Sequence, residues 1–379
     1  MNANALKLVL MLALVCATRF ADAGDYEDGA AAYRARDFGK ALNKFRLAAT
    51  AGEAYAQAIL GSMYASGEGT PQDYIESRRW LTLAAEQGLV DAQFQLGRLS
   101  ETGVGAQRNY LDAAKWYRLA AEQGSAEAQL ALGSLYLDGK GVAQDFTEAT
   151  RLYLLSATQG YALGQFSLGT LYEGVEGVAK DYGEAARWYA LAAEQNFPAA
   201  QLNIGMLYSN GLGVMQDYSE AFRYFRLAAN QGLAAAQNNL GFMYSRGQGV
   251  SKDKAEAAKW FLMSANQGYE AAQSSLGYMY ASGEGVIQDY AEAAKWYRLA
   301  AKKGNQSAQR NLSISYGKGQ GVKQNWVRAY IWANFAAISG DNEAVKLREF
   351  TLSKLTRVEI GEAQKIAKDC QARKFSGCD

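Results

Sequence analysis

This chain of 379 residues has no histidine, and its 38 acidic side chains are expected as helix caps and solvent-facing groups and not as a tuned catalytic pair. Without histidine there is no Ser-His-Asp or Cys-His triad, and most catalytic zinc sites are excluded as well. The spacing Ser-x-x-Lys, which places a nucleophilic serine near a lysine in penicillin-recognising enzymes, occurs at 251–254 and 315–318. Both copies fall in expected turns between helices, and the companion motifs Ser-Asp-Asn and Lys-Thr-Gly are absent. We therefore predict a protein that is not an enzyme and needs no cofactor or metal.

The first 23 residues have the pattern of a secretory signal peptide. Lys7 precedes an apolar run at 8–17, and Ala21-Asp22-Ala23 forms an A-x-A cleavage site before Gly24. An apolar run of about ten residues is too short for a bilayer, which needs roughly twenty. We expect export after cleavage, to the periplasm or to the outside of the cell, and no membrane span in the mature chain.

Cysteine is the other reactive side chain, at Cys16, Cys370 and Cys378. Signal cleavage would remove Cys16 and leave two cysteines in a compartment where disulfides persist. We predict a bridge between Cys370 and Cys378 that holds the C-terminal tail, with two free thiols as the alternative. Two thiols alone are too few ligands for a zinc site.

Charge excludes one class of partner. The formal net charge is +1, and without residues 1–23 the chain has 37 basic and 37 acidic side chains. Nucleic-acid binders need a basic stripe, because contacts with phosphates supply most of their affinity. No run of Lys or Arg forms such a stripe, so we exclude nucleic acid as a partner.

The elements that would position any site repeat every 36 residues. A Leu-Gly or Ile-Gly pair marks each unit, at 60–61, 96–97, 132–133, 168–169, 204–205, 240–241 and 276–277, with Leu312-Ser313 as the eighth. A Gly-x-Gly turn follows, because glycine tolerates the positive φ that stops a helix. An acid or amide with a carboxylate three residues later, as in Asp73 and Glu76, then predicts the capping box of a second helix. Each unit is thus expected to be a helix, a turn and a second helix.

A glycine inside a helix costs roughly 1 kcal/mol relative to alanine, so its repeated use needs a compensating contact. We expect Gly61 and its counterparts to let the first helix of each unit lie against alanine pairs of the second, such as Ala84-Ala85. Tryptophans of the second helix, such as Trp116, are expected to fill the wider gaps as core residues.

These spacings resemble Sel1-like repeats, which are relatives of the tetratricopeptide repeat. The resemblance covers residues 54–340 and implies an all-α fold, a right-handed α/α superhelical solenoid of helix pairs. We predict eight repeats over 53–340, a capping helix pair at 24–52 and capping helices at 341–379, since the end repeats of a solenoid lack one neighbour. Exported members of the family commonly end in a similar Cys-containing tail, which supports the predicted disulfide.

If the first helix of each pair lines the concave side, as in the relatives, two rows of residues face inward, two positions before and two after the anchor leucine. These rows vary between units while the anchors do not, and exposed apolar groups mark binding surfaces. The alternative is that several of them tuck between adjacent helices. The earlier row is Ala58, Phe94, Leu130, Phe166, Leu202, Asn238, Ser274 and Arg310, and the later row is Ser62, Arg98, Ser134, Thr170, Met206, Phe242, Tyr278 and Ile314.

We predict a scaffold of the cell envelope that binds another protein or an extended peptide segment on this face. The predicted contact residues are Phe94, Arg98, Phe166, Met206, Phe242, Tyr278, Arg310 and Ile314. A glycan or peptidoglycan binder is the alternative, because aromatic rows with interleaved polar groups also suit sugar faces. A penicillin-binding or β-lactamase-like enzyme, an activity described for some members of the family, is the third hypothesis.

Overall fold

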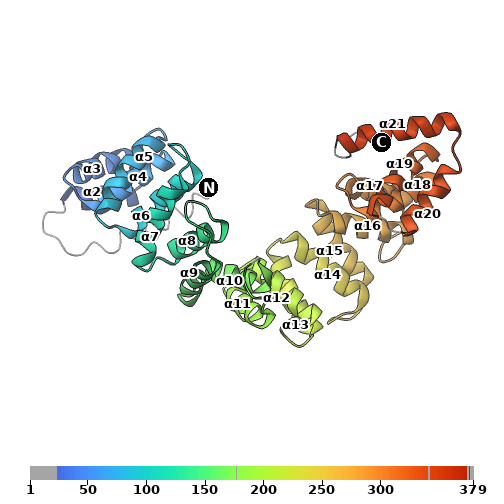
Figure 1. The fold of residues 1–379 in the computed structure, drawn as a ribbon, viewed down its shortest axis with the longest axis horizontal. Helices are drawn as coiled ribbons and strands as arrows, with labels where there is room; N and C mark the ends of the chain where they lie inside the picture. Colours follow the sequence, from blue (N-terminus) through green and yellow to red (C-terminus); the bar gives the residue numbers. More distant parts are fainter. Residues whose placement is uncertain (1–23, 176, 340–341, 374, 376–379) are drawn as a thin grey trace. The chain divides into compact units, whose positions relative to one another are not determined.

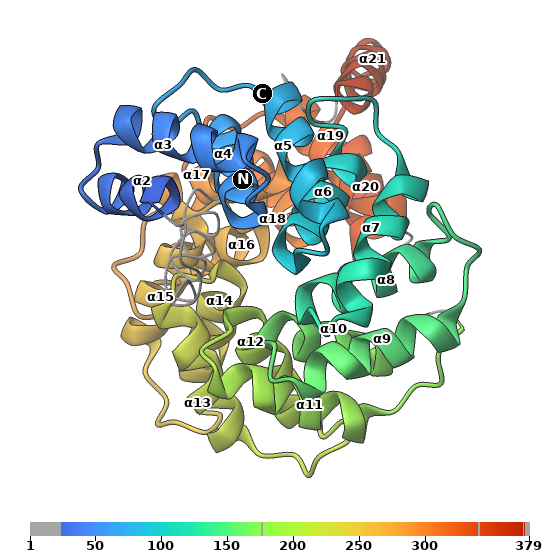
Figure 2. The ribbon, with the colours of Figure 1, turned by 90° about the vertical axis from the view of Figure 1, so that its left-hand side faces the viewer.

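The computed structural model describes residues 24–175, 177–339, 342–373 and 375, and every regular element in these residues is helical. The all-α class and the consecutive packing of helix pairs are therefore confirmed (Figures 1 and 2). The helices are α2 (Gly24–Arg34), α3 (Phe38–Thr50), α4 (Ala54–Ser66), α5 (Tyr74–Glu86), α6 (Val90–Thr102), α7 (Tyr110–Glu122), α8 (Ala126–Asp138), α9 (Phe146–Thr158), α10 (Ala162–Gly174), α11 (Tyr182–Glu194), α12 (Pro198–Asn210), α13 (Tyr218–Asn230), α14 (Ala234–Arg246), α15 (Lys254–Asn266), α16 (Glu270–Ser282), α17 (Tyr290–Ala301), α18 (Gln306–Lys318), α19 (Trp326–Ala336), η1 (Ala337–Ser339), α20 (Asn342–Leu352) and α21 (Arg357–Ala372).

The chain forms two compact units, Met1–Trp188 and Tyr189–Asp379. Within each unit, the even-numbered helix of a pair packs along the odd-numbered helix that follows it, and the odd-numbered helix then contacts the next pair. We call the even-numbered helices α4 to α18 the A helices and the odd-numbered helices α5 to α19 the B helices. Among the described residues no helix is long and apolar enough to cross a membrane.

The B helices begin at the predicted N-caps, but the capping box takes a different form. The side chain of Asp73 accepts hydrogen bonds from the backbone N–H groups of Ile75 and Glu76, at 2.9 and 3.1 Å. The backbone N–H of Asp73 donates to the carbonyl of Tyr64 on the A helix, where a capping box would have used Glu76. Glu76 instead pairs with Arg79 one turn later. The cap thus ties the two helices of a pair together.

The helical glycines do not pack against the alanine pairs of the second helix, so that expectation was wrong. A Cβ atom at Gly97 would lie 2.6 Å from ring atoms of Tyr117, and one at Gly241 would lie 2.6 Å from the ring of Phe261. The glycine therefore makes room for a large B-helix side chain, and the alanine pairs pack elsewhere in the core. Trp116 packs against the apolar cluster of the preceding repeat, which includes Leu81.

The second glycine of each turn fixes the distance between neighbouring repeats. Gly141 has φ of 71°, and a Cβ atom there would lie 2.2 Å from the carbonyl oxygen of Tyr110 in the preceding B helix. Gly249 stands in the same relation to Tyr218, at 2.1 Å. Only glycine permits this approach, because any side chain would separate the turn from the helix below it.

A ladder of buried glutamines also joins neighbouring repeats. The side-chain amide of Gln93 donates to the carbonyl of Ala85, and its oxygen accepts a hydrogen bond from Gln123 at 2.9 Å. The same pattern joins Gln129 to Gln159 and Gln237 to Gln267, at 2.8 Å in each case. Buried amides satisfied in this way stabilise one register of stacking, because a slipped repeat would leave them unpaired.

The C-terminal helices α20 and α21 pack against α19 of the last repeat, and the apolar cluster there contains Trp332, Phe335 and Cys370. Helix α21 begins with a capping box, in which Thr356 and Glu359 exchange hydrogen bonds. Cys370 is fully buried. Cys378 lies outside the described residues, as do Cys16 and the predicted signal peptide, so the disulfide and the cleavage stay predictions.

Candidate functional site

The A-helix face of the second unit carries the most accessible of the predicted contact residues. Met206 on α12 is 41% exposed and Tyr278 on α16 is 53% exposed, although both follow an anchor that is almost completely buried. Phe242 on α14 and Ile314 on α18 are half-buried. Because these four side chains share one position in successive repeats, they form a row of apolar surface whose exposure is greatest at Met206 and Tyr278.

Phe242 contributes the edge of its ring to this surface. Its ring packs edge-on against Phe261, with ring centroids 5.1 Å apart, and the guanidinium of Arg246 lies 5.4 Å from the ring centroid. At the register of Phe261 other repeats have tyrosines, such as Tyr117 and Tyr297. The floor beneath Phe242 therefore has no hydroxyl, which makes this part of the face apolar.

The surface around Tyr278 is more polar, because Tyr297 of the B helix reaches it from below. Burial raises the pKa of Tyr297, the nearby Tyr278 raises it further, and a hydrogen bond with Asn311 lowers it. The Tyr297 hydroxyl therefore keeps its proton at physiological pH. An aromatic ring beside hydroxyl and amide groups can pack on an apolar side chain and hydrogen-bond a peptide backbone at once.

A groove adjoins this row where α18 packs beside α20. It has a volume of about 520 Å³ and is lined by Arg310, Asn311, Ile314, Glu343, Lys346, Leu347 and Phe350. Two predicted contact residues, Arg310 and Ile314, thus lie in one hollow. The four residues from α20 were not predicted, because α20 has no counterpart in the other repeats with which to compare it.

In the first unit, the predicted residues Phe94 and Arg98 lie together on α6. The guanidinium of Arg98 is 6.0 Å from the centroid of the Phe94 ring, which in turn packs against Tyr117. The Tyr117 hydroxyl donates to a carboxylate oxygen of Glu101 at 2.7 Å, and burial raises its pKa. Phe166 on α10 is half-buried. This face is more polar and less exposed than that of the second unit.

Half of the earlier row is core and not surface. Ala58, Leu130, Asn238 and Ser274 are buried, and so is Ser62 from the later row. These side chains tuck between adjacent helices, which is the alternative that the sequence left open. The binding surface is therefore narrower than two full rows.

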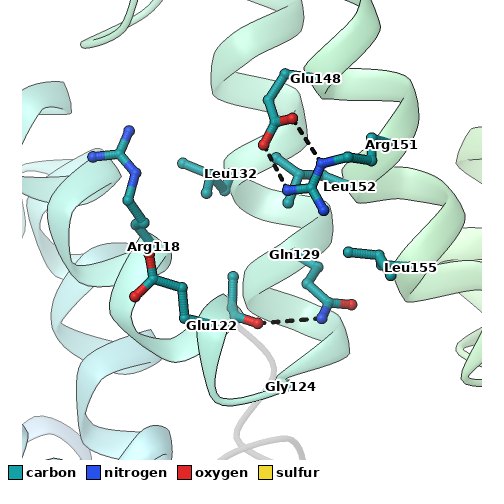
Figure 3. A pocket seen from close by; sticks show the side chains of 10 residues that line it. Arg118, Glu122, Gly124, Gln129, Leu132, Glu148, Arg151, Leu152 and Leu155 are labelled. Atoms are coloured by element: carbon teal, nitrogen blue, oxygen red, sulfur yellow. Dashed lines mark hydrogen bonds and ion pairs between the residues drawn. The ribbon is translucent and has the colours of Figure 1, made fainter.

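A second hollow, of about 380 Å³, lies on the B-helix side of the first unit (Figure 3). In it Arg151 binds Glu148 with two hydrogen bonds of 2.7 Å, and this pairing lowers the pKa of Glu148. Gln129 points instead to the backbone carbonyl of Ala121. The Arg151–Glu148 pair and Gln129 are thus held by other groups of the protein, whereas Arg118 and Glu122 line the same hollow from α7 and Arg118 donates to the hydroxyl of Tyr136.

Neither Ser-x-x-Lys tetrad forms a nucleophile site. Lys254 pairs with Glu284 at 2.8 Å and lies on a helix that Ser251 precedes. The other tetrad was expected in a turn, but Ser315 and Lys318 lie within the last turn of α18, where the Ser315 hydroxyl donates to the carbonyl of Asn311. No group of three His, Cys, Asp or Glu side chains in the described part of the chain could hold a metal.

The comparisons with known proteins give a family. The model of the Sel1 repeat matches eight consecutive segments, at 54–89, 90–125, 126–161, 162–197, 198–233, 234–269, 270–305 and 306–341. A comparison with curated proteins gives no match. Among solved structures, c5321 of uropathogenic Escherichia coli, a protective antigen with an SLR fold, is 35% identical with a TM-score of 0.81, over 89% of this chain and 74% of that one. A Sel1 repeat protein from Oxalobacter formigenes is 32% identical with a TM-score of 0.64, over 80% of this chain and 88% of that one. This chain belongs to the Sel1 repeat family.

Proposed function

We propose that the protein is a scaffold of the cell envelope that binds a partner protein on the A-helix face of its second unit. Sel1 repeat solenoids are folds generally used for protein–protein interaction. The observation that carries the proposal is the row Met206, Phe242, Tyr278 and Ile314. Its side chains are not needed for the packing that the repeats share, and two of them expose large apolar groups to solvent.

The chemistry of this face suits a protein better than a sugar. Apolar and aromatic groups beside hydroxyls and amides are typical of protein interfaces. A sugar-binding platform would need a broad ring face in the open, whereas Phe242 packs edge-on against Phe261. Tyr278 is the one aromatic of the row whose side chain is mostly open to solvent in the described second unit.

An exported location is part of the proposal. It is supported by the charged start, the short apolar run and the Ala21-Asp22-Ala23 site of the N-terminal segment. The similar E. coli protein is described as a protective antigen, which is in keeping with an exported location.

The test is crosslinking in living cells from a photoreactive amino acid at Tyr278, followed by mass spectrometry of the trapped species. The control carries the same residue at Ile287, which is 91% exposed in the turn of the same repeat. We expect an envelope protein that is trapped from position 278 and not from position 287. Glycan fragments at position 278, or the same species from both positions, would contradict the proposal.

A further inference from the structure

We propose that the groove between α18 and α20 binds a peptide segment that carries an acidic side chain next to a large apolar one. This inference deepens the proposed function, on which it rests, by giving the chemistry of the partner at one end of the face. It depends on three observations: the apolar floor of the groove, the charge of its rim and its size.

The floor is an apolar surface held in place by its surroundings. Ile314, Leu347 and Phe350 line it, and Phe350 is 51% exposed. The Phe350 ring packs edge-on against Trp326, with centroids 5.9 Å apart, and the ammonium of Lys354 lies 5.0 Å from its centroid. A ring fixed on two sides and open on a third is a preformed surface, so a ligand would lose little entropy in ordering it.

The rim is positive in a protein that is otherwise almost neutral. Arg310 and Lys346 line the groove, with Glu343 as the one carboxylate among the lining residues. Lys346 pairs with Glu343 at 2.9 Å on an exposed surface, where such a pair contributes little and is readily shared with a ligand. Among the lining residues two cations thus stand against one carboxylate, and the ammonium of Lys354 lies beside Phe350. A carboxylate is the group complementary to this rim.

The size of the groove suits a short stretch of peptide. Its volume of about 520 Å³ falls within the range of roughly 300–1,000 Å³ typical of ligand sites. Asn311 also lines the groove; its amide hydrogen-bonds Tyr297 and has a further N–H and an oxygen with which a peptide backbone could bond. The groove also continues the row at Ile314, so that an extended chain bound along Tyr278 would enter it.

The test is a selection of random dodecapeptides displayed on phage against the purified full chain. We expect the enriched sequences to place Asp or Glu within two residues of Leu, Ile, Met or Phe. For the best synthetic peptide, measured by fluorescence anisotropy, Lys346→Glu and Phe350→Ala should each weaken binding about tenfold. Affinity should also fall as salt is raised from low to high ionic strength, because the rim charges are exposed.

The matched control is Lys365→Glu, which reverses an exposed charge on α21 away from the groove. Circular dichroism checks that each variant keeps its helix content. Enriched peptides without acidic residues, or equal affinity for the parent chain, Lys346→Glu and Phe350→Ala, would overturn the inference, as would a selection that enriches nothing. If Tyr278 still traps a protein in cells, the groove proposal fails alone and the scaffold proposal stands.

Discussion

Replacing Lys303 by glutamine should stabilise the second unit, because Lys303 interrupts the glutamine ladder. In the preceding repeat Gln267 donates both to the carbonyl of Gly232 and to Gln237. At the equivalent position Lys303 donates to the carbonyl of Gly268 alone. The side-chain oxygen of Gln273 is consequently buried with no hydrogen-bond partner among the described residues.

The expected gain is about 1 kcal/mol in the free energy of unfolding. A buried acceptor without a partner costs about 1–3 kcal/mol, and an ordinary hydrogen bond contributes about 1 kcal/mol net. The bond from Lys303 to Gly268 lies at the exposed surface, and a glutamine amide can replace it as Gln267 does in its own repeat. We take the lower end of the range because the lysine loses a charge-assisted contact.

The assay is urea denaturation followed by far-UV circular dichroism. For a unit of this size the slope is about 2 kcal/mol per M, so the midpoint of the transition that includes the second unit should rise by about 0.5 M. The matched control, Gln267→Lys, breaks the intact rung to Gln237 and should lower that midpoint by a similar amount. A Lys303→Gln midpoint at or below that of the parent, with Gln267→Lys destabilising as expected, would refute the reasoning.

Three further predictions follow from buried groups in the first unit. Ser77→Ala should stabilise the chain by about 1 kcal/mol in urea melts, because its hydroxyl is buried without a partner among the described residues; an equal or lower midpoint would contradict this. Gly97→Ala should destabilise by about 2 kcal/mol or more, since its Cβ would collide with the Tyr117 ring. Gly39→Ala, in helix α3 with open space around the added Cβ, is the matched control and should not destabilise. The pKa of Tyr117 is raised in the folded chain, so its neutral hydroxyl contributes fully to the free energy of unfolding below the unfolded pKa near 10, and this contribution is lost progressively above that pH. Tyr117→Phe should therefore flatten the fall of stability between about pH 9 and 11. An unchanged pH profile would exclude this tyrosine as the source of the fall.

The repeat period made the fold predictable in detail. Because the same pattern occurs eight times, helix lengths, turns and caps that are inferred from one copy can be checked against the other seven. The partner of the helical glycines was less accessible to sequence. Gly97 and Tyr117 recur at the same positions of most repeats, but so do the alanine pairs. Only the way in which the two helices face each other in the structure shows that the aromatic ring meets the glycine.

The candidate site was predicted in part. The row through Met206 and Tyr278 is exposed, whereas Asn238 and Ser274 of the other row are buried. A helix-period argument places both rows on one side of the A helix, but it does not show how far the next A helix covers that side. Helix α20 and its Phe350 had no repeat with which to be compared.

Residues that differ from their counterparts in the other repeats can be divided into those that core packing explains and those that it does not explain. Ser100 stands where the other seven repeats have a tyrosine, and Arg78 stands opposite it and donates to its hydroxyl at 3.2 Å. A large side chain on the B helix thus occupies the space left by a small one on the A helix, and packing alone accounts for both residues. Tyr278 stands in a row whose residue changes from repeat to repeat, and its side chain is 53% exposed, so the shared packing of the repeats does not account for it. A departure that the core neither requires nor corrects indicates a contact outside the chain, which is why the search for a partner should begin at Tyr278.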